Sequence, residues 1–403
     1  NDKAVWEDGS PITAKDYEAT FAALSGKNKK FNIAASTGFD QVASFTVKSD
    51  YEFEYTFDTP YADWPNLLVG PAVPAATASD PEKWNKDNVD KPLPSSGPYV
   101  MSKMDNSAKV YTYTPNPKWW GDKPVLDKIT YTVIDQASQG QAFANNELNA
   151  VETPDIDSYT TALKKADAKA LNSGGVMYAQ LTFNGLQAPL NDVAVRKAIA
   201  MSIDRMQVAK TANEPFGIKA TTDGNWIFMP GQKGYEDTVA NKLPFDTKAA
   251  EKLLTDAGWT HADKKWTKDG KDLAFSITVP QGTKSNELRA QQIQASLAKI
   301  DIAVTLDAVP GEKYFENIMN GKYEAATFGW QGTLFPISTT EPLVYPAGKP
   351  GDEAGQNFSF ITDDSLGDLF KKANAELDVD KRLAITSQIN DTIAGFVPIG
   401  FAA

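Results

Sequence analysis

Few side chains in this sequence could carry out catalysis. Its 403 residues include one histidine, His261, and no cysteine, which excludes disulfides and cysteine nucleophiles and removes most histidine-based metal and triad chemistry. Two acidic pairs, Asp363 with Asp364 and Glu147 with Glu152, could act as the paired carboxylates of a hydrolase. The first pair is typical of a helix start and the second of surface charge. We therefore expect a protein that is not an enzyme and that uses no cofactor or metal.

The segment 328–336 is the strongest candidate for a binding site. It follows a predicted strand, and ligands of α/β proteins usually bind at the carboxyl ends of strands. Its glycines would let backbone groups approach a ligand, while Trp330 and Phe335 offer apolar walls. Packing of these two aromatic side chains in the core is an equally favoured interpretation. The candidate contacts in this segment are Trp330, Gln331, Gly332, Thr333 and Phe335.

Hydrophobic periodicity predicts the elements that position this segment. From about residue 190 onward strands and helices alternate, which is typical of an α/β domain. The predicted strands cover 273–279, 302–309 and 325–330, and the predicted helices cover 285–300 and 310–321 and begin at Asp192, Asp246, Asp364 and Asp380. Nearer the N-terminus, Thr13 and Asp16 form a capping box that predicts a helix. Alternating patterns predict strands at 53–57, 99–104, 109–114 and 129–134, and the turn-rich stretch 91–98 marks a domain boundary.

The overall composition restricts the partners. With 52 acidic and 40 basic residues the net charge is −12, which disfavours binding to nucleic acid or to an anionic membrane surface. At ~150 residues per domain the length suits two or three domains. The longest uncharged stretch, 170–191, contains asparagine, glycine, glutamine and proline residues and is too polar to span a membrane.

Eight short strings, in a fixed order along the chain, are more distinctive than periodicity. The first reads Val-Trp-Glu-Asp-Gly-Ser-Pro-Ile-Thr-Ala-Lys-Asp-Tyr at 5–17, and the others lie at 96–99, 116–121, 146–150, 181–184, 192–205, 248–259 and 357–399. Each string alone is weak. Together and in this order they resemble the extracellular solute-binding proteins of peptide-type ABC importers, the family 5 that includes oligopeptide-, dipeptide- and nickel-binding proteins.

The resemblance implies a fold class: an α/β, two-lobed flytrap of the periplasmic-binding-protein type, with an extra subdomain inserted in lobe one. On this basis residues 1–93 would form the inserted subdomain, 94–176 lobe one, 177–397 lobe two, and 398–403 the start of a strand returning to lobe one. Family members usually carry further strands before the first string and more chain after the last. We therefore expect that segments are missing at both ends.

The resemblance also implies a function and partners. Such a receptor captures oligopeptides outside the cell, in the periplasm or on the outer face of the membrane, by hinge closure. It then delivers them to the permease subunits of an ABC importer. We expect a monomer tethered by a lipid anchor that is not present in this chain, with no nucleic-acid partner.

The implied lobes supply weaker candidate contacts. A polar and aromatic loop at 223–228 belongs to lobe two, with ligand contact and burial equally favoured. Two residues after the first hinge strand could offer backbone contacts, and aromatic residues of the inserted subdomain could close over the ligand. These candidates are Asn225, Trp226 and Phe228 in the loop, Phe183 and Asn184 after the hinge strand, and Phe39 and Trp64 in the subdomain.

The class of ligand stays open at this stage. In peptide-binding relatives an aspartate pairs with the amino terminus of the peptide, whereas 325–340 contains no acid and Thr333 stands about where that carboxylate is expected. A buried ammonium without a partner is costly. Either another acid supplies the charge, or the ligand is a non-peptide solute such as an oligosaccharide, an opine or a metal chelate. The single histidine disfavours a directly ligated metal, and a hydrolase remains a remote alternative.

Overall fold

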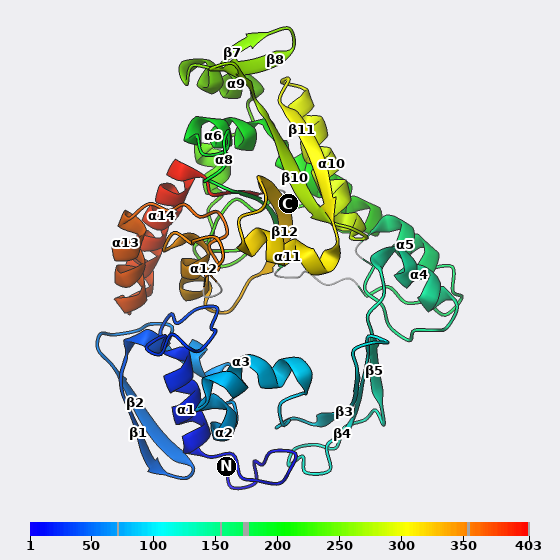
Figure 1. The fold of residues 1–403 in the computed structure, drawn as a ribbon, viewed down its shortest axis with the longest axis vertical. Helices are drawn as coiled ribbons and strands as arrows, with labels where there is room; N and C mark the ends of the chain where they lie inside the picture. Colours follow the sequence, from blue (N-terminus) through cyan, green and yellow to red (C-terminus); the bar gives the residue numbers. More distant parts are fainter. Residues whose placement is uncertain (71, 154, 172–176, 353–354, 402–403) are drawn as a thin grey trace. The chain divides into compact units, whose positions relative to one another are not determined.

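The computed structural model describes residues 1–403 except 71, 154, 172–176, 353–354 and 402–403. The chain forms two compact units, Asn1–Ile134 and Asp135–Ala403 (Figure 1). This division differs from the predicted boundaries at 93 and 176, the second of which lies outside the described residues. The difference arises because the helices that follow Ile134 pack within the second unit, where the rings of Tyr159 and Phe216 lie 5.1 Å apart. The predicted lobes themselves stay a prediction.

The first unit contains a helix packed on a hairpin. Helix α1 (Ala14–Leu24) begins at the predicted capping box, where the Thr13 amide donates to the Asp16 carboxylate at 2.8 Å. Strands β1 (Val42–Ser49) and β2 (Glu52–Phe57) pair antiparallel and contact α1. Phe21 of α1 packs edge-on against Phe45 of β1, with the ring centroids 5.1 Å apart. The predicted strand at 53–57 is thus confirmed, and its alternating aromatic residues form its buried face.

Short helices and a separate antiparallel sheet complete the first unit. The sheet has the order β3 (Tyr99–Asp105), β4 (Val110–Pro115), β5 (Ile129–Thr132), which confirms the three strands predicted there. The short helices are η1 (Phe39–Gln41), η2 (Trp64–Leu68), α2 (Ala75–Ala78) and α3 (Pro81–Asp90). Periodicity did not predict α3, whose first turn is set by Asp80, since the Asp80 carboxylate accepts from the Glu82 amide at 2.9 Å.

A mixed five-stranded sheet forms the centre of the second unit. Its order is β11 (Ala303–Val309), β10 (Ala274–Pro280), β12 (Ala325–Gln331), β6 (Met177–Phe183) and β13 (Ile399–Phe401). β10 pairs parallel with β11 and β12, whereas β6 runs antiparallel to β12 and β13. The described part of the C-terminal strand therefore lies in the same sheet as β6. Its predicted continuation at 402–403 lies outside the described residues.

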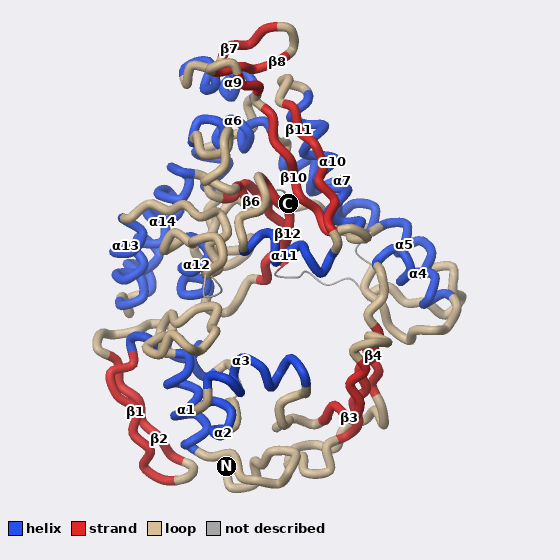
Figure 2. The backbone as a smooth tube through the Cα atoms, viewed as in Figure 1, coloured by secondary structure: helices blue, strands red, loops and turns tan. Residues whose placement is uncertain are grey.

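Helices cover this sheet, and aspartates cap the N-termini of several of these helices. Figure 1 shows α10 (Lys284–Ala298) lying along β10 and β11, and Figure 2 shows α13 (Ser365–Ala375) beside α14 (Val379–Phe396). The predicted helix starts at Asp192 and Asp246 are confirmed, because these residues cap α6 (Val193–Ser202) and α9 (Thr247–Asp256). The cap of α14 is Asp378 rather than the predicted Asp380, since the Asp378 carboxylate accepts from the Lys381 amide.

The remaining elements of the second unit are short. They are α4 (Gln136–Ala144), α5 (Ile156–Ala162), α7 (Arg205–Asn213), η3 (Glu214–Phe216), α8 (Thr238–Lys242), α11 (Gly311–Met319), α12 (Pro336–Val344) and the three-stranded sheet β7 (Thr260–Ala262), β8 (Lys265–Lys268), β9 (Lys271–Asp272). His261 of β7 is partly exposed and lies 2.9 Å from the Asp301 carboxylate. Across the described ranges, every helix is too short or too polar to cross a membrane.

Candidate functional site

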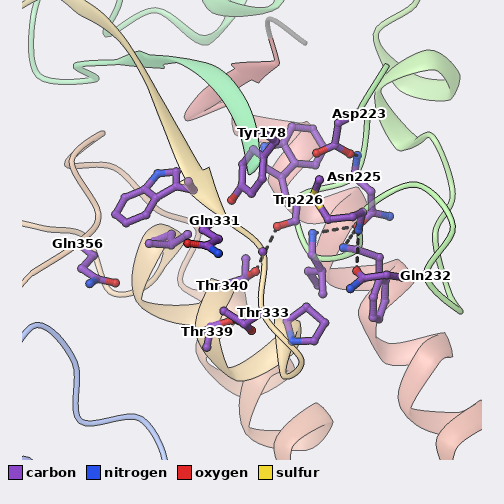
Figure 3. A pocket seen from close by; sticks show the side chains of 17 residues that line it. Tyr178, Asp223, Asn225, Trp226, Gln232, Gln331, Thr333, Thr339, Thr340 and Gln356 are labelled. Carbon is purple, nitrogen blue, oxygen red and sulfur yellow. Dashed lines mark hydrogen bonds between the residues drawn. The ribbon is translucent and has the colours of Figure 1, made fainter. Parts of the chain in front are cut away.

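A cavity of about 190 Å³ lies within the second unit (Figure 3). Its lining comes from Tyr178 at the start of β6, the loop 223–232, the segment 330–343 and Gln356. Ligand pockets usually measure ~300 Å³ or more. A space of this size therefore suits one part of a ligand, such as a single residue of a chain.

The end of β12 enters the cavity because the strand runs beyond the core. Its first four residues are buried, whereas Gly329 and Gln331 are exposed and Trp330 is half-buried. The antiparallel register sets Trp330 opposite Tyr178 of β6, and directly opposed residues of such a pair project from the same face. The Trp330 ring also stacks on Phe358, with an angle of 12° between the ring planes. Both predicted roles of Trp330, cavity wall and packing, are thus present together.

The segment after β12 is a turn that begins α12. The Thr333 hydroxyl accepts from the Phe335 amide at 3.1 Å and lies 2.8 Å from the Thr339 hydroxyl. Thr333 lines the cavity, but its oxygen already serves this turn. Gln331 and Gly332 also line the cavity, whereas Phe335 does not. The Phe335 carbonyl instead accepts from the Thr339 hydroxyl at 3.0 Å.

The loop 223–232 is folded by its own side chains. The Asn225 amide oxygen accepts from the backbone amides of Ile227 and Phe228 at 2.9 and 2.8 Å, and the Asn225 amide nitrogen donates to the Glu236 carbonyl at 3.0 Å. Asn225 therefore positions the loop, and it lines the cavity together with Trp226 and Phe228. The loop is also tied to α12, because the Thr340 hydroxyl donates to the Trp226 carbonyl at 3.2 Å.

Asp223 begins the predicted candidate loop 223–228 but was not among the individual contacts predicted there. It is buried, with 7% of its surface exposed, and it lines the cavity. Burial raises the pKa of its carboxyl to about 7, although the Asn225 and Gly224 amides and Arg205 act in the opposite direction. The sequence signal was an acid beside a glycine in a polar loop. The same signal is shared by the many aspartates of this chain that cap helices, such as Asp192 and Asp246.

Gly224 allows the close packing behind Asp223. A Cβ atom at this position would lie 1.7 Å from the Asp237 carboxylate and 2.9 Å from the Arg205 guanidinium. These two groups form an ion pair at 3.2 Å, with both side chains largely buried. Only glycine fits here, so the loop and the ion pair are built as one unit.

Besides Phe335, four predicted contacts do not line this cavity. Phe183 and Asn184 are fully buried, and their backbone amides donate to the carbonyls of Pro398 and Glu324. The Asn184 side chain donates to the Tyr323 carbonyl at 2.8 Å. The backbone amides of these two residues are therefore used within the protein, and their role as ligand contacts stays a prediction.

The other two residues, Phe39 and Trp64, belong to the first unit. The Phe39 ring packs edge-on against Phe21 with the centroids 5.0 Å apart. Trp64 has 50% of its surface exposed and so has apolar area available for a contact. Their role as ligand contacts stays a prediction.

Of the two acidic pairs that suggested a hydrolase, one lies at a helix start and the other is exposed. Asp363 accepts from both the amide and the hydroxyl of Ser365 at the start of α13, which lowers the pKa of its carboxyl. This confirms the interpretation of Asp363 and Asp364 as a helix start. Glu147 and Glu152 are exposed. Among the described residues, no group of three or more histidine, aspartate or glutamate side chains is arranged to hold a metal ion.

Solved structures define the class of protein to which this fold belongs. The chain superimposes on the oligopeptide-binding protein AppA from Bacillus subtilis in complex with a nonapeptide with a TM-score of 0.84, 22% identity and coverage of 99% of this chain and 79% of AppA. A mannohexaose-bound periplasmic oligopeptide-binding protein from Thermotoga maritima gives a TM-score of 0.85, 21% identity and coverage of 100% and 77%. The predicted fold class, an α/β protein of the periplasmic-binding-protein type, is confirmed.

Sequence comparison then identifies the family. The model of the bacterial extracellular solute-binding proteins, family 5 (middle region), matches residues 1–350, so this chain belongs to that family. The oligopeptide-binding protein OppA of Mycobacterium tuberculosis strain H37Rv is 33% identical over 398 residues, which is 98% of this chain and 66% of OppA. The chain thus spans just under two thirds of the length of this relative. The resemblance predicted from the eight strings is confirmed.

Proposed function

We propose that this protein is the substrate-binding receptor of an ABC importer and that it captures extracellular oligopeptides. The observation that carries this proposal is the 33% identity to an oligopeptide-binding protein over 98% of the chain. The cavity supports it, because polar amide and hydroxyl groups beside aromatic walls suit a peptide backbone and its side chains. Its volume of about 190 Å³ suits one residue of such a ligand.

The mechanism that follows is capture rather than catalysis. Ligand binding favours a closed form by hinge closure, which requires that the ligand interact better with the closed state than with the open one. The closed form then docks on the permease subunits of the importer. We also propose that the protein works outside the cytoplasm as a monomer held by a lipid anchor, and that it has no enzyme activity. The family description, extracellular solute-binding proteins, supports the location.

A second candidate keeps the receptor class but changes the ligand to an oligosaccharide. Two observations favour it: the segment 325–340 contains no acid, and two tryptophans, Trp226 and Trp330, form cavity wall. Sugar rings stack on tryptophan faces, so replacing either tryptophan by alanine would abolish sugar binding. Peptide binding, which rests mainly on backbone hydrogen bonds, would be less sensitive to Trp226→Ala or Trp330→Ala.

Calorimetric titration of the protein with two ligand panels tests the proposal. Tri- to penta-alanine peptides form one panel, and manno- and cello-oligosaccharides of three to six units form the other. We expect saturable binding of peptides and none of sugars. Binding of sugars alone would replace the peptide receptor with the second candidate. The same mixtures, followed for hours by mass spectrometry, would reveal a hydrolase through product formation that scales with protein concentration.

A further inference from the structure

Asp223 is the one charged side chain among the described residues that line the cavity. Its carboxylate accepts from the Asn225 amide at a long 3.3 Å, and the Gly224 amide also acts on it. A buried carboxylate normally has a cationic partner or several strong donors, because an unpaired buried charge is costly. Among the described residues Asp223 forms no ion pair, and the Asn225 and Gly224 amides and Arg205 only partly offset the effect of burial.

The cation that acts on Asp223, Arg205, already binds other groups of the protein. One nitrogen of its guanidinium donates to the backbone carbonyl of Asp223 at 2.6 Å, and another donates to the Asp237 carboxylate at 3.2 Å. Asp237 also caps α8 through the Ala240 amide at 2.7 Å. Arg205 therefore pairs directly with Asp237 and compensates the negative charge of Asp223 only in part.

The rest of the cavity wall suits a cation. Aromatic side chains of Trp226 and Tyr178 border the space (Figure 3), and Trp330 also lines it. Aromatic faces attract cations through the ring quadrupole. No lysine or arginine lines it among the described residues. The volume of about 190 Å³ is below that of a whole-ligand pocket, so the cation would be one end or one side chain of a longer molecule.

We propose that Asp223 binds a primary ammonium group of the ligand inside this cavity. This inference rests on the proposed function, since in an oligopeptide the ammonium is either the free amino terminus or a lysine side chain. It accounts for the absence of an acid from 325–340, because the acid is supplied from the opposite wall. A bound metal ion is disfavoured because, within the described ranges, Asp223 belongs to no group of three or more acidic or histidine side chains that could hold one.

The proposal predicts that binding is linked to protons. In the empty cavity burial raises the pKa of Asp223 to about 7, and an ammonium beside it would stabilise the charged carboxylate and release a proton. The groups that face Asp223 are Arg205, Asp237, Tyr178 and Tyr235. The pKa values of both tyrosines are raised by burial, so these rings stay neutral below pH 9. Affinity for an ammonium should therefore rise with pH up to about 7 through Asp223 alone.

The test compares ligands with and without an ammonium on two matched variants. Tetra-alanine, N-acetyl-tetra-alanine and an N-acetylated tetrapeptide with one lysine are titrated by calorimetry into the wild type, Asp223→Asn and Asp256→Asn. Asp256 is an exposed acid paired with Lys252 and serves as the control for loss of one negative charge. Circular dichroism and thermal melts confirm that each variant is folded.

The expected result is a loss of at least tenfold in wild-type affinity when the amino terminus is acetylated. Asp223→Asn should bind tetra-alanine at least tenfold more weakly than wild type and should bind the acetylated form equally well, whereas Asp256→Asn should behave as wild type. Recovery of affinity by the lysine-containing peptide would assign the site to a lysine side chain. Equal discrimination against acetylation by wild type and Asp223→Asn would overturn the proposal, as would wild-type affinity for the free peptide that is unchanged between pH 5.5 and 7.5.

Failure of the proposed function would look different. If no peptide binds the wild type, the receptor is not for oligopeptides, and the role of Asp223 is then decided with alaninamide and putrescine as probes. Protection of the wild type but not of Asp223→Asn against thermal unfolding by these amines would support the ammonium site. No protection, or equal protection of both proteins, would reject it.

Discussion

The two walls of the cavity are built in different ways. In the loop 223–232 the Asn225 amide group is fully used by backbone groups, and the loop is pinned to α12 and to Asn390 of α14, whose side chain accepts from the Trp226 amide at 2.8 Å. In the opposite wall, Gln331 at the end of β12 is exposed, and no hydrogen bond of its side chain to another described residue exists. We infer that the loop 223–232 is a rigid wall that holds a charge and that the end of β12 at Gln331 is the adaptable wall.

In the proposed receptor, this difference would combine selectivity with tolerance. A fixed carboxylate requires a rigid surrounding, because the cost of its burial is recovered only when a ligand cation is placed against it. Amide side chains that are free to rotate can instead follow ligands of different sequence. We expect the first wall to recognise what all ligands share and the second to accept what differs among them.

Removing the charge of Asp223 should have the largest effect on the difference between the two walls. Because the folded-state pKa of Asp223 is raised from 3.8 to about 7, the folded protein holds a proton that the unfolded chain has released between these values. The contribution of Asp223 to folding stability is therefore fully present below pH ~4, falls as pH rises, and is lost above pH ~7. Relative to wild type, Asp223→Asn should gain up to ~4 kcal/mol in free energy of unfolding between pH 4 and 8.

Urea unfolding midpoints of the two proteins at pH 4.5, 6 and 8 measure this gain. The same substitution that weakens ligand binding should thus stabilise the empty protein at pH 8, as expected for a functional group placed at a cost in stability. A difference between the two proteins that does not change with pH would show that the carboxylate is not destabilised by burial.

The second prediction concerns the scaffold of the rigid wall. Asn225→Ala leaves two buried backbone amides and one carbonyl without their partner, and each such group costs about 1–3 kcal/mol. We expect a loss of about 3 kcal/mol or more in the free energy of unfolding, measured with urea at pH 7. A loss below 1 kcal/mol would mean that the loop is held by other contacts.

The third prediction separates turn formation from ligand binding at Thr333. Thr333→Ala removes the acceptor of the Phe335 amide and should cost about 1 kcal/mol of stability. Thr333→Ser keeps that oxygen and should restore the loss, and neither variant should change the affinity for tetra-alanine more than threefold. If Thr333→Ala weakens peptide binding strongly while N-acetylation of the peptide has no effect, then Thr333 rather than Asp223 recognises the ligand end.

The smallest effect on stability is expected in the adaptable wall. Gln331→Ala removes an exposed side chain that has no partner among the described residues, so the free energy of unfolding should change by less than ~0.5 kcal/mol. A change above 1 kcal/mol, measured under the same urea conditions as for Asn225→Ala, would show that both walls are equally built into the fold.

Much of the fold could be predicted because local signals agree with tertiary packing. The strand and helix order 273–331 followed from alternating apolar residues and glycine stops, and the caps at Asp192 and Asp246 followed from their position before apolar repeats. The division into units was not predictable in this way. It depends on contacts such as that between Tyr159 and Phe216, which lie far apart in sequence.

The site was only partly predictable, for a similar reason. Residues that leave a strand end, such as Trp330 and Gln331, could be selected from sequence because strand ends are where ligands bind. Asp223 and Asn225 could not be told apart, since both are polar residues of one loop. Among the described residues, Asp223 is a carboxylate without an ion pair and Asn225 is a scaffold. These roles depend on where Arg205 and Asp237 meet in space.

The account rests on the claim that this protein is a receptor for oligopeptides. A native mass spectrum of the purified protein, recorded alone and after incubation with an equimolar mixture of random tetrapeptides and mannohexaose, tests this claim most directly. The account predicts adducts whose masses are spaced by amino-acid residues and which disappear on denaturation. An adduct with the mass of mannohexaose, or an unchanged protein mass in the presence of the peptides, would contradict it.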